Sequence, residues 1–347
     1  MTSATICCAN RVAPRHGTTP TVMQLGAGVN LKFRSGWRGL VQPLLILVIV
    51  AFWGRAIWHD WNQIATTTWR ISWWALGLSF AVLIVQALVV AVAWWWTLAM
   101  MGERLPLRQG VGMWLQSQLA RYLPGGVWDM TARVVMGRQA GVSARGTSAS
   151  LVLEMGMQIL SGAVFLVIAL VWRRDAVPPA YLAIAGAAIL AMLILMLPPV
   201  FVPLTNWGLR ILRRPPLEMR LTYPGMVGIF GVRLFGHLLL GISFVLFVNS
   251  LQPVSSSMIV PLASAYVGAW LIGVLAIFVP AGIGVREGAL YWLLGGQFPL
   301  LPVATIALGF RLLISGRDLL VALYGRQSAR PADRKDQAPL AENVTHE

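Results

Sequence analysis

Two short segments combine Pro/Gly helix breaks with charged side chains, inside sequence that is otherwise apolar enough to cross a membrane. The first, Arg121–Asp129, reads Arg-Tyr-Leu-Pro-Gly-Gly-Val-Trp-Asp, and the second, Val279–Gly288, reads Val-Pro-Ala-Gly-Ile-Gly-Val-Arg-Glu-Gly. A broken helix leaves backbone groups that hydrocarbon cannot satisfy, so each segment must be buried in protein or line a wet cavity. Two such breaks in corresponding places of two halves point to a binding site for a transported molecule.

The first break supplies groups that suit an anion. Pro124, Gly125 and Gly126 stop a helix, and free backbone amides at such a tip attract negative charge. Asp129 and Arg133 are four residues apart, so they share one face of the helix that follows. We expect a helical hairpin that dips into the membrane from the cytoplasmic side. An amphipathic loop on the membrane surface is the alternative.

Three more ionisable side chains lie within apolar segments between the two breaks. A carboxylate at the depth of Glu154 must face protein, a cavity or a cation, and Arg133 or Arg138 are the nearest candidate partners in sequence; Glu154 could instead reach the interface. Arg233 and His237 share one helical face, which makes this histidine as much a candidate functional residue as a structural one.

The second break places adjacent opposite charges directly after its glycines. Pro280, Gly282 and Gly284 precede Arg286 and Glu287. The glycine spacing is wrong for a dinucleotide-binding loop, and no soluble strand comes before it, so we reject that function. The last two glycines of the segment could instead allow close helix packing.

The last apolar segment also carries charge. Arg311 lies in its middle and is expected to face the interior of the bundle, because an arginine exposed to lipid is costly. Arg317 and Asp318 are expected nearer the inner membrane interface.

Signatures of an enzyme or a metalloprotein are missing from the sequence. The two cysteines, Cys7 and Cys8, are adjacent in a polar leader, which suits neither a disulfide framework nor a metal site. No metal-spaced Cys/His set or nucleotide-binding loop is present. We therefore expect no catalytic activity, no metal and no cofactor.

The elements that must position these residues are transmembrane helices. The chain has 347 residues, 57% of them hydrophobic and 11% charged, with a mean hydropathy of +0.71. This composition predicts an all-α polytopic membrane protein with about eight spans and two broken, re-entrant segments. The predicted spans are Leu40–Trp58, Trp73–Met100, Ser148–Trp172, Ala180–Leu204, Pro224–Ser250, Met258–Val279, Ile283–Gln297 and Pro302–Leu323.

The predicted domain organisation is a single membrane domain between two polar ends. Residues 1–36 are expected to be a disordered leader, 37–324 the transmembrane domain, and 325–347 a disordered cytoplasmic tail. Met23 is an alternative start of the chain.

The basic residues define a topology. The net charge is +15, but its arginines gather in alternate loops, which favours the positive-inside rule over nucleic acid as a partner. With both ends inside, one side carries 19 Lys and Arg and the other carries 4, so the N-terminus is expected in the cytoplasm. Ile283–Gln297 is short for a crossing; if it is re-entrant, the tail lies outside instead.

The residues discussed so far resemble the lysylphosphatidylglycerol synthase transmembrane-region family of flippase-like membrane proteins. The similarity covers roughly Gly36 to Leu323 and rests on the run Trp114–Trp128, then Arg133, Gly137-Arg138-x-x-Gly141-Val142-Ser143, Glu154 and Pro280–Gly288. The resemblance implies a domain associated with moving charged lipids between leaflets. Stand-alone members look like partners of envelope glycosyltransferases or translocators of polyprenyl lipids. The aminoacyl-transferring domain is not in this sequence, so we do not expect the chain to make the lipid.

The leading hypothesis is a flippase-like lipid transporter of the bacterial inner membrane, whose two breaks form an arginine-rich cavity for a phosphate-bearing headgroup. Guanidinium suits phosphate because its donors match two oxygens at once. One alternative is a membrane scaffold for an envelope glycosyltransferase; the other is an enzyme acting on a lipid-linked substrate. The candidate substrate-binding residues are Arg121, Tyr122, Pro124, Gly125, Gly126, Asp129, Arg133, Glu154, Pro280, Gly282, Gly284, Arg286, Glu287 and Arg311.

Overall fold

The computed structural model describes most of the predicted membrane domain. The described residues are 71–122, 127–174, 177–276, 282, 284–295 and 300–328. Outside them lie the leader, the predicted span Leu40–Trp58, the tail beyond Ser328, and the candidate site residues Pro124, Gly125, Gly126 and Pro280.

Within the described residues the fold is all-α, as the sequence predicts, and contains no strand. Five segments are long and apolar enough to cross a membrane: α3, α6, α7, α9 and Ser256–Leu275, which includes α10. The helices are α3 (Trp73–Met100), α4 (Leu107–Ser117), α5 (Trp128–Gln139), α6 (Ala144–Trp172), α7 (Pro179–Met196), α8 (Pro198–Ile211), α9 (Tyr223–Leu251), α10 (Ile259–Leu275), α11 (Val285–Leu293) and α12 (Leu300–Ser328), with the 3-10 helices η1 (Gln118–Tyr122) and η2 (Ser256–Met258).

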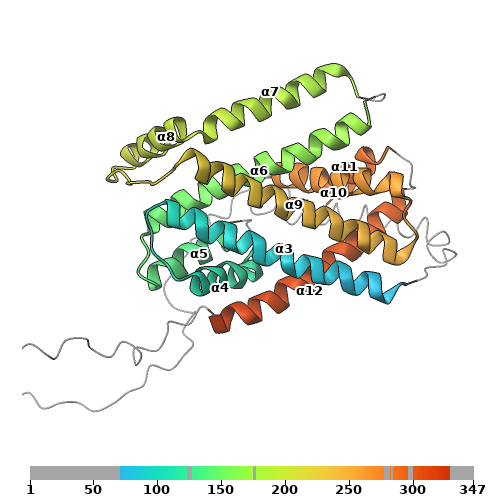
Figure 1. Ribbon diagram of the computed structural model, residues 1–347, viewed down its shortest axis with the longest axis horizontal. Helices are drawn as coiled ribbons and strands as arrows, with labels where there is room; N and C mark the ends of the chain where they lie inside the picture. Colours follow the sequence, from blue (N-terminus) through green and yellow to red (C-terminus); the bar gives the residue numbers. More distant parts are fainter. Residues whose placement is uncertain are drawn as a thin grey trace, which may run out of the picture. The chain divides into compact units, whose positions relative to one another are not determined.

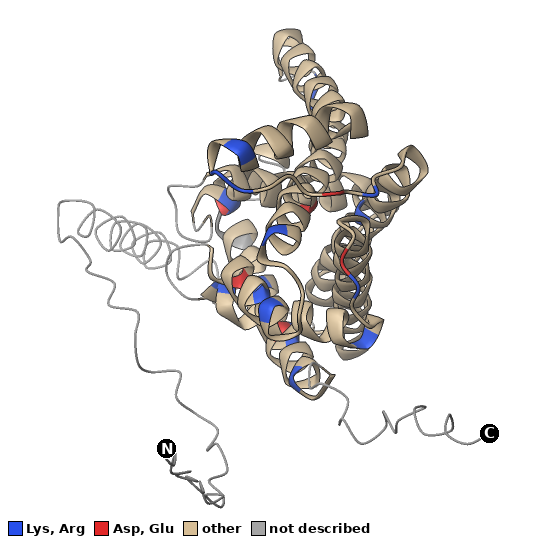
Figure 2. Ribbon diagram, turned by 90° about the vertical axis from the view of Figure 1, so that its left-hand side faces the viewer, with Lys and Arg blue, Asp and Glu red and all other residues tan. Residues whose placement is uncertain are grey.

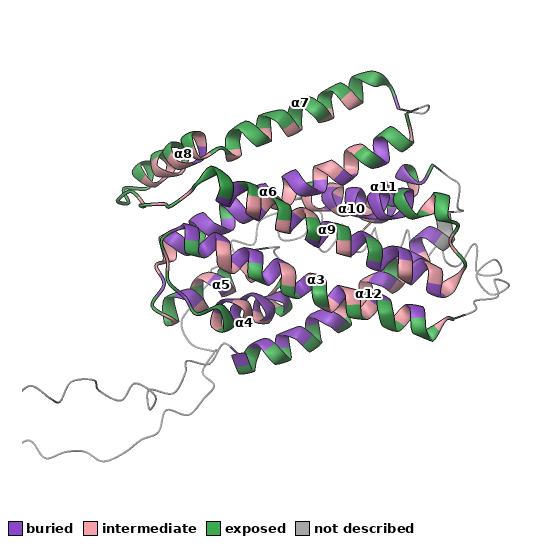
Figure 3. Cartoon of the chain, viewed as in Figure 1, coloured by how far each residue is buried: buried purple, intermediate pink, exposed green. Residues whose placement is uncertain are grey.

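The predicted span Ala180–Leu204 is wrong as a single helix. The structure divides it into α7 and α8 at Leu197, whose ψ of 138° is extended. The cause is Pro198, because the ring of a proline disfavours the α conformation of the residue before it. The 18-residue helix α7 has no buried residue, and Figure 3 shows it exposed along its length.

Helices α3 and α9 run antiparallel and form the centre of the bundle (Figure 1). Ser79 Oγ donates to the carbonyl of Ser243 at 2.8 Å, and Ser243 Oγ donates to the carbonyl of Ser79 at 2.9 Å. At Gly236, an added Cβ would lie 2.9 Å from Val90, so the helices approach closely there. Membrane helices commonly associate through interhelical hydrogen bonds and close packing at small residues. The hydrophobic effect does not favour their association, because lipid tails are as apolar as the helices.

One end of the bundle collects basic residues, and we call it the basic end. Here α3 ends while α6 and α9 begin, and the backbone N–H of Arg220 donates to the carbonyl of Met100 at 2.8 Å. Figure 2 looks onto this end and shows Lys and Arg on the loops that face the viewer. The loop between α8 and α9 carries Arg213, Arg214 and Arg220.

Helix α12 runs from the opposite end toward the basic end. Its Gly309 lies against Phe247 near the end of α9, whereas Gly325 lies against the backbone of Gly112 in α4. The described chain therefore finishes at the basic end, on the same side as the α8–α9 loop. The sequence left this open because Ile283–Gln297 is short for a crossing.

Two helical hairpins enter the bundle from opposite ends (Figure 1). The first consists of α4, η1 and α5; it starts and finishes at the basic end and packs against α3, α6 and α12. Trp114 and Leu115 of α4 are 5% and 0% exposed, so this hairpin lies within the bundle rather than on its surface. The dipping hairpin therefore describes this segment better than the surface loop does.

The second hairpin consists of α10 and α11. Gly273 lies beside Arg286 and Gly268 beside Leu293, which makes the two helices antiparallel. The nine residues of α11 span about 14 Å, less than half the membrane. Its end is held at the opposite end of the bundle, where Arg173 Nη1 donates to the carbonyl of Trp292 at 2.6 Å.

An aromatic cluster fixes the second hairpin against the core. The rings of Phe244 and Tyr266 stack with centroids 4.2 Å apart, and Phe310 meets Tyr266 edge-on at 4.9 Å. These residues come from α9, α10 and α12, and all are at most 1% exposed. The packing sets how α10 presents its inner half to the first hairpin.

We predict that single cysteines will report these two ends in a chain lacking Cys7 and Cys8. Cysteine at Ser256, between α9 and α10, should react with an impermeant thiol reagent added outside intact cells, whereas cysteine at Glu218 or Gln327 should react only after permeabilisation. The basis is the basic end, which should face the cytoplasm. The reverse labelling would overturn the orientation, and opposite behaviour of positions 218 and 327 would contradict the course of α12.

Candidate functional site

Four helices meet at the buried carboxylate of Glu154. Arg133 of α5 donates to one of its oxygens. Arg233 of α9 donates to the other at 2.7 Å, and Trp114 of α4 also donates to that oxygen at 3.2 Å. Glu154 is 4% exposed, so it faces protein rather than the interface. Of the two arginines that the sequence offered as partners, Arg133 pairs with it while Arg138 is exposed.

A second carboxylate completes this group. Asp129 Oδ2 lies 3.6 Å from Arg133 Nη2, one helical turn away as the spacing predicts. The Arg133 guanidinium also lies 5.4 Å from the ring centroid of Trp94, within range of a cation–π contact. We call Asp129, Arg133, Glu154 and Arg233 the Glu154 cluster. Its two acids and two bases cancel, so it is electrically neutral and joins the first hairpin to α6 and α9.

His237 connects the same region to the second hairpin. It lies one turn beyond Arg233, and its Nδ1 is 2.9 Å from Ser161 Oγ of α6. Its ring packs against Trp270 of α10 with centroids 4.9 Å apart. The shared face of Arg233 and His237 thus points inward, and each residue has a hydrogen-bond partner on α6, although Arg233 Nε is buried without one.

Asp318 of α12 anchors a second group of charges. It is fully buried and accepts from Arg317 at 2.6 and 3.0 Å and from the Tyr122 hydroxyl at 2.9 Å. Arg121 Nη1 lies 3.7 Å from the other side of this carboxylate. Arg317 and Asp318 lie closer to the basic end than Arg311, and they are buried beneath η1 while α12 continues beyond them to Ser328.

Neutral side chains extend the Asp318 group. Gln86 of α3 accepts from Arg317 Nη1 at 2.6 Å, Gln118 accepts from Arg121, and the Tyr122 hydroxyl also donates to Ser315 at 3.1 Å. Gln86 and Ser315 carry no sequence signal of their own. They are found only when the helices are brought together.

Glu287 closes the start of α11. It is 1% exposed, and its Oε2 accepts from the backbone N–H of Gly284 at 2.7 Å. Its Oε1 lies 3.3 Å from Arg311 Nε. Sequence alone left open whether Arg311 pairs with this acid or binds a ligand, and the structure shows the ion pair.

Arg286 differs from its neighbours. Its Nε is buried and has no hydrogen-bond partner, and the hydroxyl of Tyr266 is in the same state. Arg286 lies within electrostatic range of Arg311, Glu287 and Arg121, so it brings the second hairpin close to the first. An unsatisfied buried donor is costly and calls for an explanation.

These charges form one group where the hairpins meet, and we call it the junction cluster. It contains four arginines and two carboxylates, so its net charge is +2, in contrast to the neutral Glu154 cluster. Its members are Arg121, Arg286, Arg311, Arg317, Glu287 and Asp318.

Gly282 allows the second hairpin to turn this closely. Its φ is +63°, and an added Cβ would lie 2.7 Å from the carbonyl oxygen of Gly273. A Cβ at Gly273 would lie 3.3 Å from Arg286 Nε. The glycines of the second break therefore set the position of Arg286.

Comparison with known proteins places this arrangement in a family. The family model described as lysylphosphatidylglycerol synthase TM region matches residues 40–315. The chain belongs to this family. The matched range includes both hairpins and both charged clusters, as well as the predicted span at Leu40–Trp58. Neither a curated protein nor a solved structure matches the chain.

The junction cluster of this TM-region protein has the donor chemistry of an anion-binding site. Among the described residues no group of three or more His, Cys, Asp or Glu could hold a metal ion. The junction cluster instead offers guanidinium groups, which bind phosphate or carboxylate through paired N–H donors.

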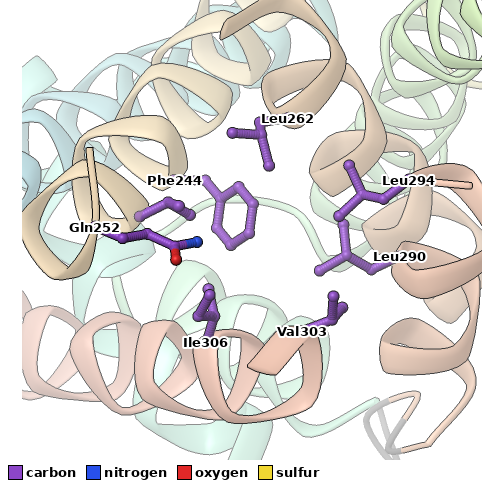
Figure 4. A pocket seen from close by; sticks show the side chains of 8 residues that line it. Phe244, Gln252, Leu262, Leu290, Leu294, Val303 and Ile306 are labelled. Carbon is purple, nitrogen blue, oxygen red and sulfur yellow. The ribbon is translucent and has the colours of Figure 1, made fainter. Parts of the chain in front are cut away.

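An apolar pocket lies beside the second hairpin, between α9, α10, α11 and α12. In Figure 4, Phe244, Leu262 and Leu290 surround it, and Gln252 is the polar residue of its lining. The pocket offers no charged group, so it suits hydrocarbon rather than a headgroup.

We predict that Glu154→Gln destabilises the protein strongly. Removing one partner of a buried ion pair costs roughly 3–5 kcal/mol because the remaining charge is uncompensated. Thermal unfolding in detergent should show a large drop for this variant and little change for Glu218→Gln, an exposed control. Adding Arg233→Gln should restore part of the loss. A Glu154→Gln protein as stable as the parent would contradict the cluster's structural role.

We also predict that Gly282→Ala distorts the second hairpin, because it adds both backbone strain at positive φ and a clash with Gly273. Gly288→Ala is the matched control, since nothing lies within 4 Å of a Cβ there. The first variant should lose thermal stability while the second should keep it. Equal behaviour would show that this approach of the two segments is not required.

Proposed function

We propose that this protein moves a lipid with a phosphate-bearing headgroup between the leaflets of the bacterial inner membrane. The observation that carries the proposal is Arg286, half-buried at the point where the two hairpins meet, whose Nε atom is buried and has no hydrogen-bond partner. Desolvating a guanidinium is expensive unless an anion compensates it. A headgroup phosphate would supply both the charge and the acceptors.

The arrangement of the hairpins supports transport rather than simple lipid binding. One hairpin enters from the basic end and the other from the opposite end, so their junction lies between the two ends of the bundle. Sites near the bilayer midplane, formed by discontinuous helices, are typical of transporters that open alternately to the two sides. Arg121 and Tyr122 of η1 are exposed, which leaves the junction accessible on the side of the first hairpin.

The division of charge supports a role for each cluster. The neutral Glu154 cluster would hold the first hairpin in place, while the junction cluster would bind the headgroup. Of the candidate arginines, Arg286 and Arg121 would contact phosphate directly. Arg311, which pairs with Glu287, would help to position the second hairpin.

The alternative function is a scaffold for an envelope glycosyltransferase. Membership of the family is compatible with it, since the comparison identifies a transmembrane region and no activity. A scaffold, however, has no use for an excess of positive charge where the two hairpins meet, and this favours transport.

We predict that the purified protein in liposomes accelerates flipping of a phospholipid with a fluorescent acyl chain, measured as loss of fluorescence to an impermeant reductant. Arg286→Gln should slow this at least tenfold, because a charge-assisted hydrogen bond contributes about 1.5–3 kcal/mol. Arg326→Gln, which changes an exposed arginine at the basic end, should flip lipid at the parent rate.

Protein-free liposomes and liposomes with an unrelated helical membrane protein set the background of this assay. A parent protein that moves no phosphate-bearing lipid above that background, yet co-purifies with a glycosyltransferase, would overturn transport and support the scaffold.

A further inference from the structure

We infer that the junction cluster selects a headgroup carrying two negative charges, as a phosphate monoester or a diphosphate diester does. This inference rests on the proposed function and adds the substrate class. It depends on the charge balance of the cluster together with two buried donors that have no partner.

The charge balance is incomplete within the described protein. Four arginines face two carboxylates at the junction, which leaves two positive charges. The Glu154 cluster is neutral and has nothing to contribute. The segments 123–126, 277–281, 283 and 296–299, which lie outside the described residues, contain no charged residue in the sequence. Arg121 is exposed and Arg286 is half-buried, but Arg286 Nε is buried without a partner, so we assign the compensating charge there to an anionic ligand.

Two orphaned donors show where that ligand would bind. Arg286 Nε and the Tyr266 hydroxyl are buried without partners, on α11 and α10. Tyr266 and Gly273 are seven residues apart on one face of α10, and a Cβ at Gly273 would lie 3.3 Å from Arg286 Nε, so both donors lie on the side of α10 that faces the start of α11. An oxyanion can accept from both, whereas an ammonium or a hydrocarbon cannot.

The acids of the junction argue against zwitterionic and cationic headgroups. Glu287 is held by Gly284 and Arg311, and Asp318 by Arg317 and Tyr122. Both carboxylates are at most 1% exposed. An ammonium group could reach only Glu287 Oε1, which makes no hydrogen bond but already lies 3.3 Å from Arg311 Nε, and it would add to the excess of positive charge.

Headgroup chemistry then ranks the ligands by charge. A phosphate monoester carries about −1.5 to −2 charges at pH 7, because its second pKa is near 6. A phosphate diester such as phosphatidylglycerol carries one negative charge, and phosphatidylethanolamine carries none. Only the first of these neutralises the junction.

The test is equilibrium binding to the purified full chain in neutral detergent, with lipids that share dioleoyl tails. Phosphatidic acid should bind at least tenfold more tightly than phosphatidylglycerol at pH 7.5, and phosphatidylethanolamine more weakly still. At pH 5 the monoester carries about one charge, so the two anionic lipids should bind alike. Inorganic phosphate, which has no acyl chains, tests whether the lipid tail matters. If it competes at the concentrations at which phosphatidic acid binds, the site takes a free anion and the assignment of a lipid ligand is overturned.

Variants distinguish selection for a doubly charged headgroup from a general attraction of the basic protein to anions. Arg286→Gln should bring the affinity ratio of phosphatidic acid to phosphatidylglycerol close to one, while Arg286→Lys should keep the preference. Arg326→Gln, the exposed control, should leave the ratio unchanged. If Arg286→Gln does not fold, Arg121→Gln serves instead, since its side chain is 40% exposed and tolerates change more readily.

The outcomes distinguish this inference from the proposed function. Equal binding of both anionic lipids at pH 7.5, or an Arg286→Gln variant that weakens both by the same factor, would overturn the charge selection while flipping continued. A parent protein that neither binds nor flips any phosphate-bearing lipid would instead remove the proposed function itself.

Discussion

The neutralisation of Glu154 by two arginines from different helices is the interaction on which the rest of the structure depends. A carboxylate in the interior of a membrane protein is retained only when cations and donors compensate it. Here the compensation comes from Arg133 of α5, Arg233 of α9 and Trp114 of α4. One acid on α6 therefore holds both helices of the first hairpin and the central helix α9. Because this cluster is neutral, burying the first hairpin leaves no uncompensated charge at Glu154. The hairpin can then place η1 over α12.

The position of η1 in turn creates the junction. Tyr122 and Arg121 reach Asp318 because α4 packs against α12, where Gly325 brings the two backbones close. From the other end, the aromatic packing around Tyr266 and the Gly273–Gly282 approach place Arg286 at the same depth. The two hairpins thus depend on different interactions, one ionic and one steric, and meet where neither supplies enough negative charge.

Local features of the sequence predicted part of this, and contacts between distant segments explain the rest. The bounds of α3, Trp73–Met100, could be read directly because its apolar run is uninterrupted. The break at Leu197 has a local signal, because Pro198 and Pro199 follow it. The uninterrupted apolar composition nevertheless led to the prediction of one continuous span. The pairing of Arg233 with Glu154 joins residues 79 positions apart, and the burial of Asp318 depends on η1, so neither has a local signal. The segments around Pro124 and Pro280 were identified by their helix breaks and remain sequence predictions.

The contrast between the two clusters bears on function more than either does alone. If charged residues were present in this bundle only to fix helices, both clusters should resemble the Glu154 cluster, in which every charge has a partner and the sum is zero. Buried donors without partners occur in both clusters, namely Arg133 Nε and Arg233 Nε in one and Arg286 Nε and the Tyr266 hydroxyl in the other, but only the junction keeps a positive excess. A stable fold tolerates such a deficit when a ligand supplies what is missing, because the free energy of binding then offsets the free energy of leaving the charge uncompensated.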